Sequence, residues 1–439
     1  MSHKIGVILF PGTNCELEAI RALKRSGFEV TLIRWNDQKV DYTSFDGFFM
    51  PGGFAYEDRG RSGIIASKDP LVQKIKAEAD KGKLVIGVCN GAQVVLEAKM
   101  IPGLDRNHVE MALAWNKRTD KNGKILGTGF YNDWIYIKST GKKGRSAYNF
   151  IEDNHIMRIP VAHGEGRYTT LDNELLDVLK NNDQLVFSYC SKEGETINEF
   201  PINPNGAVLN IAGICNTEGN VLALMPHPER TINGQAIFES MKAYLDKSFS
   251  IILPQQTPFR ESKLTDEIKS YEHPDIEILV DLVITDNEER TIEHTIHDIG
   301  FKGIKLKKHT YFKIDPEEGC DHKDLARNLI DSGELVNLAK EIPTIIIKNK
   351  DYYAYDQSKG LTKIRRSSKR NKTHYLTFDK ENVLGDNLVQ TLNNHFNIKG
   401  IKSIKVGKKW TMNTDEITGE QVVKTQIFHN PHAMDIFKA

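Results

Sequence analysis

Residues 1–90 alternate between short apolar runs and helix-like patterns. The helix-like segments, residues 17–23 and 71–81, carry apolar side chains at helical spacing, and Gly27 follows the first as a stop signal. The apolar runs of strand length are residues 5–10, 30–33, 48–50 and 84–88. Such runs are typical of strands buried on both faces. The pattern predicts an α/β fold, with an open, mostly parallel sheet and helices on both faces.

In such a sheet, functional sites lie in the loops after the carboxyl ends of the strands. Three of these loops begin after Phe10, Met50 and Val88. Residues 104–224 are richer in strands and loops, and a last strand near residue 224 leads into Pro226-His227-Pro228-Glu229-Arg230. A helix is predicted over residues 235–244. These elements form a first predicted domain, residues 1–250, followed by a linker at residues 251–273.

Two similar segments lie beyond the predicted linker. Residues 295–304 align with residues 392–401, an offset of 97 residues. Each segment has a predicted strand before it, a helix leading into a Lys-Gly-Ile turn, and a strand after it. We interpret them as a tandem pair of small α+β modules, residues 274–349 and 373–439, with chance similarity as the alternative. A basic linker, residues 350–372, separates them and is either a solvated connection or a docking segment for an acidic or phosphorylated partner.

The composition excludes several classes of protein. With 439 residues, two to four domains are expected, and 59 basic residues balance 59 acidic residues. A net charge of zero provides no overall attraction to nucleic acid or to a membrane. No apolar run is long enough for a transmembrane helix, and the N-terminus leads directly into a strand without signal-peptide character. Five scattered cysteines argue against a disulfide framework, so a cytoplasmic location is expected.

Cys89 lies in the segment Gly87-Val88-Cys89-Asn90-Gly91, where a buried strand is predicted to turn sharply into a helix. This is the arrangement of a nucleophile elbow with sulfur as the nucleophile. The flanking glycines relieve crowding in the turn, and the helix N-terminus favours the thiolate. The alternative is a small structural cysteine of the core, and this segment alone does not decide between the two.

His227 and Glu229 favour the catalytic interpretation. They are two residues apart, so an extended segment directs both side chains to one side. A histidine can accept the thiol proton and return it to a leaving amine, and a glutamate can orient the imidazole. Pro51-Gly52-Gly53 also follows a strand, and its glycines allow a backbone N–H to approach a reacting carbonyl, as an oxyanion hole requires.

These three motifs, in this order, resemble the class I (triad) glutamine amidotransferases, which have a flavodoxin-like fold. More narrowly, residues 1–250 resemble the small glutaminase subunits of phosphoribosylformylglycinamidine synthase, a purine-pathway enzyme. Further stretches that carry the resemblance are Phe10-Pro11-Gly12-Thr13-Asn14-Cys15-Glu16, Ala162-His163-Gly164-Glu165-Gly166-Arg167 and Asn203-Pro204-Asn205-Gly206. The two C-terminal modules resemble the small bridging subunit of the same synthase, so the tandem pair resembles a dimer fused in one chain.

The resemblance implies a glutaminase in which Cys89, His227 and Glu229 form the triad. The backbone amides of Gly53 and Asn90 would form the oxyanion hole. It also implies four residues that hold the glutamine substrate: Gly52, Gln93, His163 and Gly164. The ammonia would pass to a separate ATP-dependent synthetase that makes formylglycinamidine ribonucleotide, and the bridging modules would join the two proteins.

No cofactor or metal is expected in this chain, because no phosphate-binding Gly-x-x-x-x-Gly-Lys-Ser/Thr loop or carboxylate cluster stands out. ATP and Mg²⁺ are expected on the synthetase partner. The sequence departs from the family at Gly129, Tyr131 and Asp133, where the family has arginines and a glutamate, so contacts made by those charges are in doubt. Two alternatives remain: another hydrolase of the cysteine-elbow superfamily, and a non-catalytic assembly adaptor of the same complex.

Overall fold

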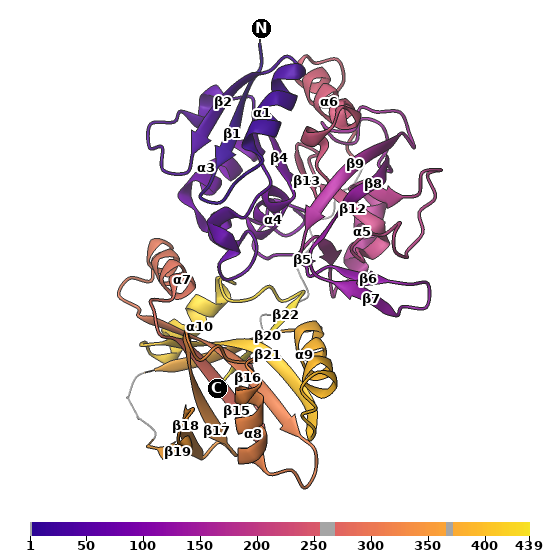
Figure 1. Ribbon diagram of the computed structural model, residues 1–439. Helices are drawn as coiled ribbons and strands as arrows, with labels where there is room; N and C mark the ends of the chain where they lie inside the picture. The colour runs from indigo at the N-terminus through magenta and orange to yellow at the C-terminus, as the bar shows by residue number, and fades with distance from the viewer. Residues whose placement is uncertain (1, 255–267, 366–371) are drawn as a thin grey trace. The chain divides into compact units, whose positions relative to one another are not determined.

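The computed structural model describes residues 2–254, 268–365 and 372–439 (Figure 1). The chain divides into two compact units, Met1–Thr265 and Asp266–Ala439. Part of the predicted linker at 251–273 and part of the basic stretch at 350–372 lie outside the described residues. Among the described residues, no helix has both the length and the apolar character needed to cross a bilayer.

The first unit is built on a sheet that has nine strands in the described residues, in the order β2-β1-β3-β4-β13-β12-β11-β8-β9. The five strands from β2 to β13 are parallel, and the remaining four extend the sheet with antiparallel pairs. The strands are β1 (Lys4–Leu9), β2 (Glu29–Arg34), β3 (Gly47–Met50), β4 (Leu84–Val88), β8 (Tyr131–Ser139), β9 (Ile156–His163), β11 (Leu185–Cys190), β12 (Ile211–Cys215) and β13 (Val221–Leu224). The predicted mixed α/β fold is confirmed.

The connection from β1 to β2 runs in one direction along the sheet, and that from β3 to β4 runs in the other. Right-handed crossovers therefore place their helices on opposite faces, and the order reverses between β1 and β3. Such a switch point is where α/β sheets bind ligands. The helices of this unit are α1 (Glu16–Arg25), α2 (Ile64–Lys68), α3 (Pro70–Ala79), α4 (Asn90–Glu97), α5 (Asn173–Asn181) and α6 (Gln235–Leu245).

Helix α3 begins one residue before the predicted start because Asp69 caps it. The Asp69 carboxylate accepts a hydrogen bond from the backbone N–H of Leu71, and Pro70 occupies the first turn. The strand-rich middle of the unit also contains two short ribbons. One pairs β5 (Ala112–Ala114) with β10 (Arg167–Thr169), and the other pairs β6 (Lys117–Thr119) with β7 (Ile125–Thr128).

The second unit is a sheet with nine strands in the described residues, in the order β14-β22-β20-β21-β16-β15-β17-β18-β19. Both predicted modules contribute to this one sheet. Its strands are β14 (Lys269–Ser270), β15 (Ile276–Leu282), β16 (Leu306–Pro316), β17 (Glu341–Ile347), β18 (Asp351–Asp356), β19 (Gly360–Ile364), β20 (Thr373–Asp379), β21 (Ile401–Met412) and β22 (Met434–Lys438). Its helices are α7 (Asn287–Asp298), α8 (His322–Asp331), α9 (Val383–Asn394) and α10 (Glu416–Lys424).

The two modules are arranged about a pseudo-two-fold axis. The 97-residue offset maps β15 onto β20, end to end. At the centre of the sheet, β16 and β21 are antiparallel, with Thr310 opposite Lys408 and Tyr311 opposite Gly407. The offset maps Thr310 onto Gly407 and Tyr311 onto Lys408, so it exchanges these two pairs. This is the geometry of an isologous interface within one chain. Each module continues past the predicted strand–helix–strand unit with a second helix and a third strand.

The prediction of a linker over residues 350–372 is wrong for its first part. Residues 351–364 form the hairpin β18–β19, which extends the sheet beyond β17. Charged residues such as Lys359 and Lys363 suggested a solvated connection, but lysines are also common on exposed edge strands, where they discourage pairing with other chains. Asp356 accepts backbone hydrogen bonds from Ser358 and Lys359, and these bonds form the turn.

We predict that Gly385→Ala destabilises the second unit. Gly385 lies in α9 against β21, and a Cβ at this position would be 2.0 Å from the carbonyl oxygen of Ile404. The helix must move away from the sheet, at an expected cost of about 1–3 kcal/mol in the free energy of unfolding. Denaturant unfolding of the full chain, with hydrogen exchange of the β21 amides, measures the loss. Leu384→Ala is the control, because its side chain is 49% exposed on the same helix. Equal stability of the two variants would contradict the packing described here.

Candidate active site

Cys89 occupies a sharp turn between β4 and α4. Its backbone has φ 53° and ψ −110°, a strained conformation for a residue with a side chain. Its N–H donates to the carbonyl of Leu224, which ties the turn to β13. A Cβ on Gly91 would lie 1.9 Å from the carbonyl oxygen of Met50, and a Cβ on Gly87 would lie 2.4 Å from that of Gly91. Glycine is therefore required at positions 87 and 91, because neighbouring backbone carbonyls lie too close for a side chain.

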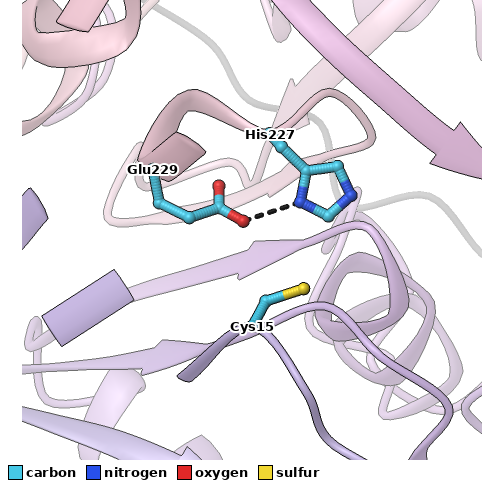
Figure 2. A group of neighbouring side chains, drawn as sticks. All are labelled: Cys15, His227 and Glu229. Atoms are coloured by element: carbon cyan, nitrogen blue, oxygen red, sulfur yellow. Dashed lines mark hydrogen bonds and ion pairs between the residues drawn. The ribbon is translucent and has the colours of Figure 1, made fainter. Parts of the chain in front are cut away.

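The loop after β13 brings His227 and Glu229 to the same place. Their side chains form a hydrogen bond of 2.6 Å between His227 Nδ1 and Glu229 Oε1, and both residues are buried (Figure 2). The backbone N–H of His227 donates to the carbonyl of Pro160 at 2.9 Å, which fixes the loop on β9. Glu229 is thus placed to orient the imidazole, as a nucleophile–base–orienter arrangement requires.

Charge around His227 determines its protonation. Burial alone lowers the pKa of this histidine, but the negative charge of Glu229 and the neighbouring thiols of Cys89 and Cys15 raise the pKa overall, well above its ordinary value. The structure therefore favours an imidazolium beside the sulfur of Cys89. The Cys89 thiol also lies 3.6 Å from the carbonyl oxygen of Ala162 on β9.

Cys15 is a second thiol at this site that the sequence reasoning did not select. It follows β1, and its N–H donates to the carbonyl of Gly52 at 3.2 Å. Arg230 donates from Nη2 to Cys15 Sγ at 2.9 Å. Figure 2 shows the thiol pointing toward His227 and Glu229. The available signal was its position in the loop after the first strand, one of the three loops expected to meet at the site.

Gly52 and Gly53 lie between these groups. A Cβ on Gly52 would be 2.8 Å from His227 Cε1 and 3.1 Å from Cys15 Sγ, so only glycine fits. Gly53 has φ +143°, and a Cβ there would be 2.7 Å from the carbonyl oxygen of Gly12. Among the described residues, the backbone N–H groups of Gly53 and Asn90 donate to no acceptor. Both groups are available to an oxyanion.

The Asn90 side chain connects the elbow to the loop after β3. Its Oδ1 accepts a hydrogen bond from the N–H of Ala55 at 2.9 Å, and its Nδ2 donates to Asp58 at 2.9 Å and to Gln93 at 2.8 Å. Burial raises the pKa of Asp58 to about 6, despite the hydrogen bond from Asn90. Gln93 in turn donates to the carbonyl of Glu165 at 2.6 Å. The Gln93 amide is engaged with protein groups, and its predicted contact with glutamine stays a prediction.

The other predicted substrate residues, His163 and Gly164, lie at the end of β9 and just after it. His163 is buried and its Nδ1 is 3.2 Å from Asn116 Oδ1. Burial and the positive charge of His227 lower the pKa of His163 to about 3, so it is neutral at physiological pH. The carbonyl of Gly164 accepts the N–H of Asn116 at 2.8 Å. Asn116, another residue missed in the sequence, thus fixes both positions.

The residues that depart from the family lie beside His163. Tyr131 is opposite His163 in the β8–β9 pair, and its hydroxyl donates to Asp133 at 2.8 Å. The guanidinium of Arg118 lies 5.3 Å from the centre of the Tyr131 ring. The Tyr131 hydroxyl and the Asp133 carboxylate are therefore hydrogen-bonded to each other on β8, in the region where the resemblance implied arginines and a glutamate. Gly129 has φ +75°, a left-handed conformation that favours glycine.

Comparisons with known proteins identify relatives of the first unit. The model of the CobB/CobQ-like glutamine amidotransferase domain matches residues 2–250. The phosphoribosylformylglycinamidine synthase subunit PurQ of Methanothrix thermoacetophila is 41% identical over 261 residues, which cover 56% of this chain and 98% of that protein. The PurQ subunit of Pyrococcus horikoshii is 36% identical over 251 residues, with coverages of 56% and 99%. A chain of the solved PurLQS structure from Thermotoga maritima shares 30% identity at a TM-score of 0.44, covering 56% of this chain and 100% of that one.

The protein belongs to the CobB/CobQ-like glutamine amidotransferase family. It is a glutamine amidotransferase enzyme, and its N-terminal unit is PurQ-like. The resemblance inferred for residues 1–250 is confirmed at this level. The roles of the individual site residues, and the resemblance of the two C-terminal modules to a bridging subunit, stay predictions.

We predict that His163 makes the protein less stable in acid. In the folded chain it takes up a proton only near pH 3, whereas its ordinary pKa is 6.5. Acid below about pH 6.5 therefore favours the unfolded chain, by about 1.4 kcal/mol per pH unit at most. His163→Asn, which keeps a donor near Asn116, should lose less stability than the native chain between pH 6.5 and 4.5.

Denaturant unfolding at a series of pH values measures this difference. His155→Asn is the matched control, because it makes the same substitution at an exposed histidine. Parallel stability curves for the native chain and His163→Asn would mean that His163 does not remain neutral in the fold.

Proposed function

We propose that this chain is the glutaminase component of phosphoribosylformylglycinamidine synthase in purine biosynthesis. The observation that carries the proposal is the meeting of the Cys89 thiol with the buried His227–Glu229 pair, whose hydrogen bond is 2.6 Å. A thiol, a histidine and an orienting carboxylate form a complete set for nucleophilic acyl transfer. The match to a glutamine amidotransferase domain supports glutamine as the substrate. The names of relatives 36–41% identical to this chain support phosphoribosylformylglycinamidine synthase as the enzyme.

In the proposed reaction, the Cys89 thiolate attacks the side-chain amide carbon of glutamine. The N–H groups of Gly53 and Asn90 stabilise the resulting oxyanion, since both are free to donate. His227 protonates the departing nitrogen, ammonia leaves, and a glutamyl thioester remains on Cys89. His227 then accepts a proton from water, which attacks the thioester and releases glutamate. Glu229 holds the imidazole in position throughout.

The substrate would lie along the loops that carry Gly52, His163, Gly164 and Gln93. Gly52 leaves room beside the imidazole, because any side chain there would contact His227. His163 is neutral and buried, so it can act through hydrogen bonding without bringing a second positive charge to the site. Gln93 positions Asn90 and the backbone of Glu165 in the described conformation.

The ammonia would be used by an ATP-dependent synthetase that carries ATP and Mg²⁺ and makes formylglycinamidine ribonucleotide. We assign the second unit to the contact with that synthetase. Its two modules are related by a pseudo-two-fold axis through the β16–β21 pair, as in a bridging-subunit dimer joined in one chain. Joining this unit to the glutaminase would raise the effective concentration of one component near the other.

Cys89→Ala is expected to abolish synthesis that uses glutamine while ammonia-dependent synthesis is retained. The substitution removes the nucleophile but leaves the synthetase partner and its ATP site unchanged. The measurement is product formation by the reconstituted complex, with glutamine or with an ammonium salt as nitrogen donor. Cys190→Ala is the control, because Cys190 is a buried cysteine on β11 that makes no contact in the proposed mechanism. Loss of both activities in Cys89→Ala would make Cys89 structural.

Removal of Asp266–Ala439 is expected to weaken binding to the synthetase and to leave the first unit folded. The boundary follows the division of the chain into two compact units. Co-sedimentation of the full and shortened chains with the synthetase measures binding, and circular dichroism reports folding of the shortened chain. Binding of a folded short chain at full strength would remove the bridging role from the second unit.

A further inference from the structure

Three potential metal ligands meet inside the active site. Cys15, His227 and Glu229 are the group among the described residues whose ligand atoms all lie within 4.8 Å of one another (Figure 2). Their exposed fractions are 1%, 1% and 4%, so solvent does not screen them. They come from two loops at the carboxyl ends of β1 and β13. The proposed reaction uses His227 and Glu229 but has no role for Cys15.

Two atoms of this cluster lack hydrogen-bond partners. His227 Nε2 and Glu229 Oε2 are buried and make no hydrogen bond with the described residues. Burying a polar atom without a partner is unfavourable, and such atoms often face a ligand. Thiolate, imidazole and carboxylate are the ligand types that zinc prefers in proteins. A set of three protein ligands leaves a fourth position open, as in zinc sites that also bind water or another small ligand.

We propose that Cys15, His227 and Glu229 bind a thiophilic divalent cation of the zinc type, and that the bound ion switches off the glutaminase. The Glu229 carboxylate supplies negative charge to the cluster, and a bound metal ion displaces the protons of Cys15 and His227, because both must be deprotonated to act as ligands. Arg230 fixes the Cys15 sulfur by a hydrogen bond of 2.9 Å. A metal on His227 occupies the nitrogen lone pair that the proposed reaction needs as a base, so the inhibitory effect rests on the proposed function.

Metal binding is tested on the full chain without glutamine. Zinc is titrated in competition with a chromophoric chelator, and circular dichroism checks that each variant is folded. Cys15→Ala should weaken zinc binding by about 10–100-fold. Glu229→Gln keeps both thiols and should weaken it as well, which gives a second variant if Cys15→Ala fails to fold. Cys190→Ala and Cys89→Ala should bind zinc like the native chain, because neither residue is in the proposed ligand set.

Native-like zinc affinity in a folded Cys15→Ala variant would overturn the proposal, as would loss of zinc binding in Cys89→Ala. The first result would remove Cys15 from the ligand set, and the second would assign the ion to the Cys89–His227 pair. Inhibition is a separate measurement: glutamate release with and without zinc, each variant compared with its own metal-free rate. If zinc binds and glutamate release is undiminished, the proposed inhibition by the bound ion is wrong. No glutamate release under any condition would contradict the proposed function and leave the binding result unaffected.

Discussion

The active site depends on close backbone approach at the carboxyl end of the central parallel strands. Gly91 lies so near the carbonyl of Met50 that a Cβ would be 1.9 Å from that oxygen. Gly52 and Gly53 fill the remaining space between the loops after β1 and β3. With larger residues at these points, the elbow of Cys89 and the loop of Gly53 would separate. The backbone segments that carry Gly53 and Asn90 would then lie farther apart.

Burial gives the His227–Glu229 pair its electrostatic character. An imidazolium removed from water is unfavourable by itself, and the 2.6 Å contact with Glu229 compensates for it. The same burial keeps His163 neutral, because a second cation next to His227 would add repulsion to the cost of desolvation. Two histidines in one site therefore have opposite protonation states. The difference comes from the carboxylate that one has and the other lacks, a division of roles common in sites that carry out acid–base chemistry.

Much of this fold and site could be predicted from the sequence because the signals are local. The run at 84–88 matches β4, and the glycines at 87 and 91 marked the elbow. Contacts between distant segments could not be predicted in this way. Arg230 reaches Cys15 across 215 residues of sequence, and only the order of the parallel strands brings them together. Gln93 was expected to face the substrate by resemblance, yet its amide bonds Glu165, a partner 72 residues away. The hairpin β18–β19 was missed because charged edge strands and solvated linkers have similar compositions.

The two modules of the second unit share one strand pairing but hold their helices by different contacts. The 97-residue offset maps Glu288 in α7 onto Gly385 in α9. Glu288 is held by Lys308 and by Lys408, the latter at 2.5 Å, and these lysines outweigh burial and lower its pKa to about 2. Gly385 instead allows α9 to lie against the backbone of β21. Helix α7 is thus held to β16 and β21 by ion pairs, whereas α9 packs directly against the backbone of β21. Both arrangements are compatible with the same β16–β21 register. The pairing of these two strands is therefore the feature that the modules have in common, and the contacts of the helices with it differ.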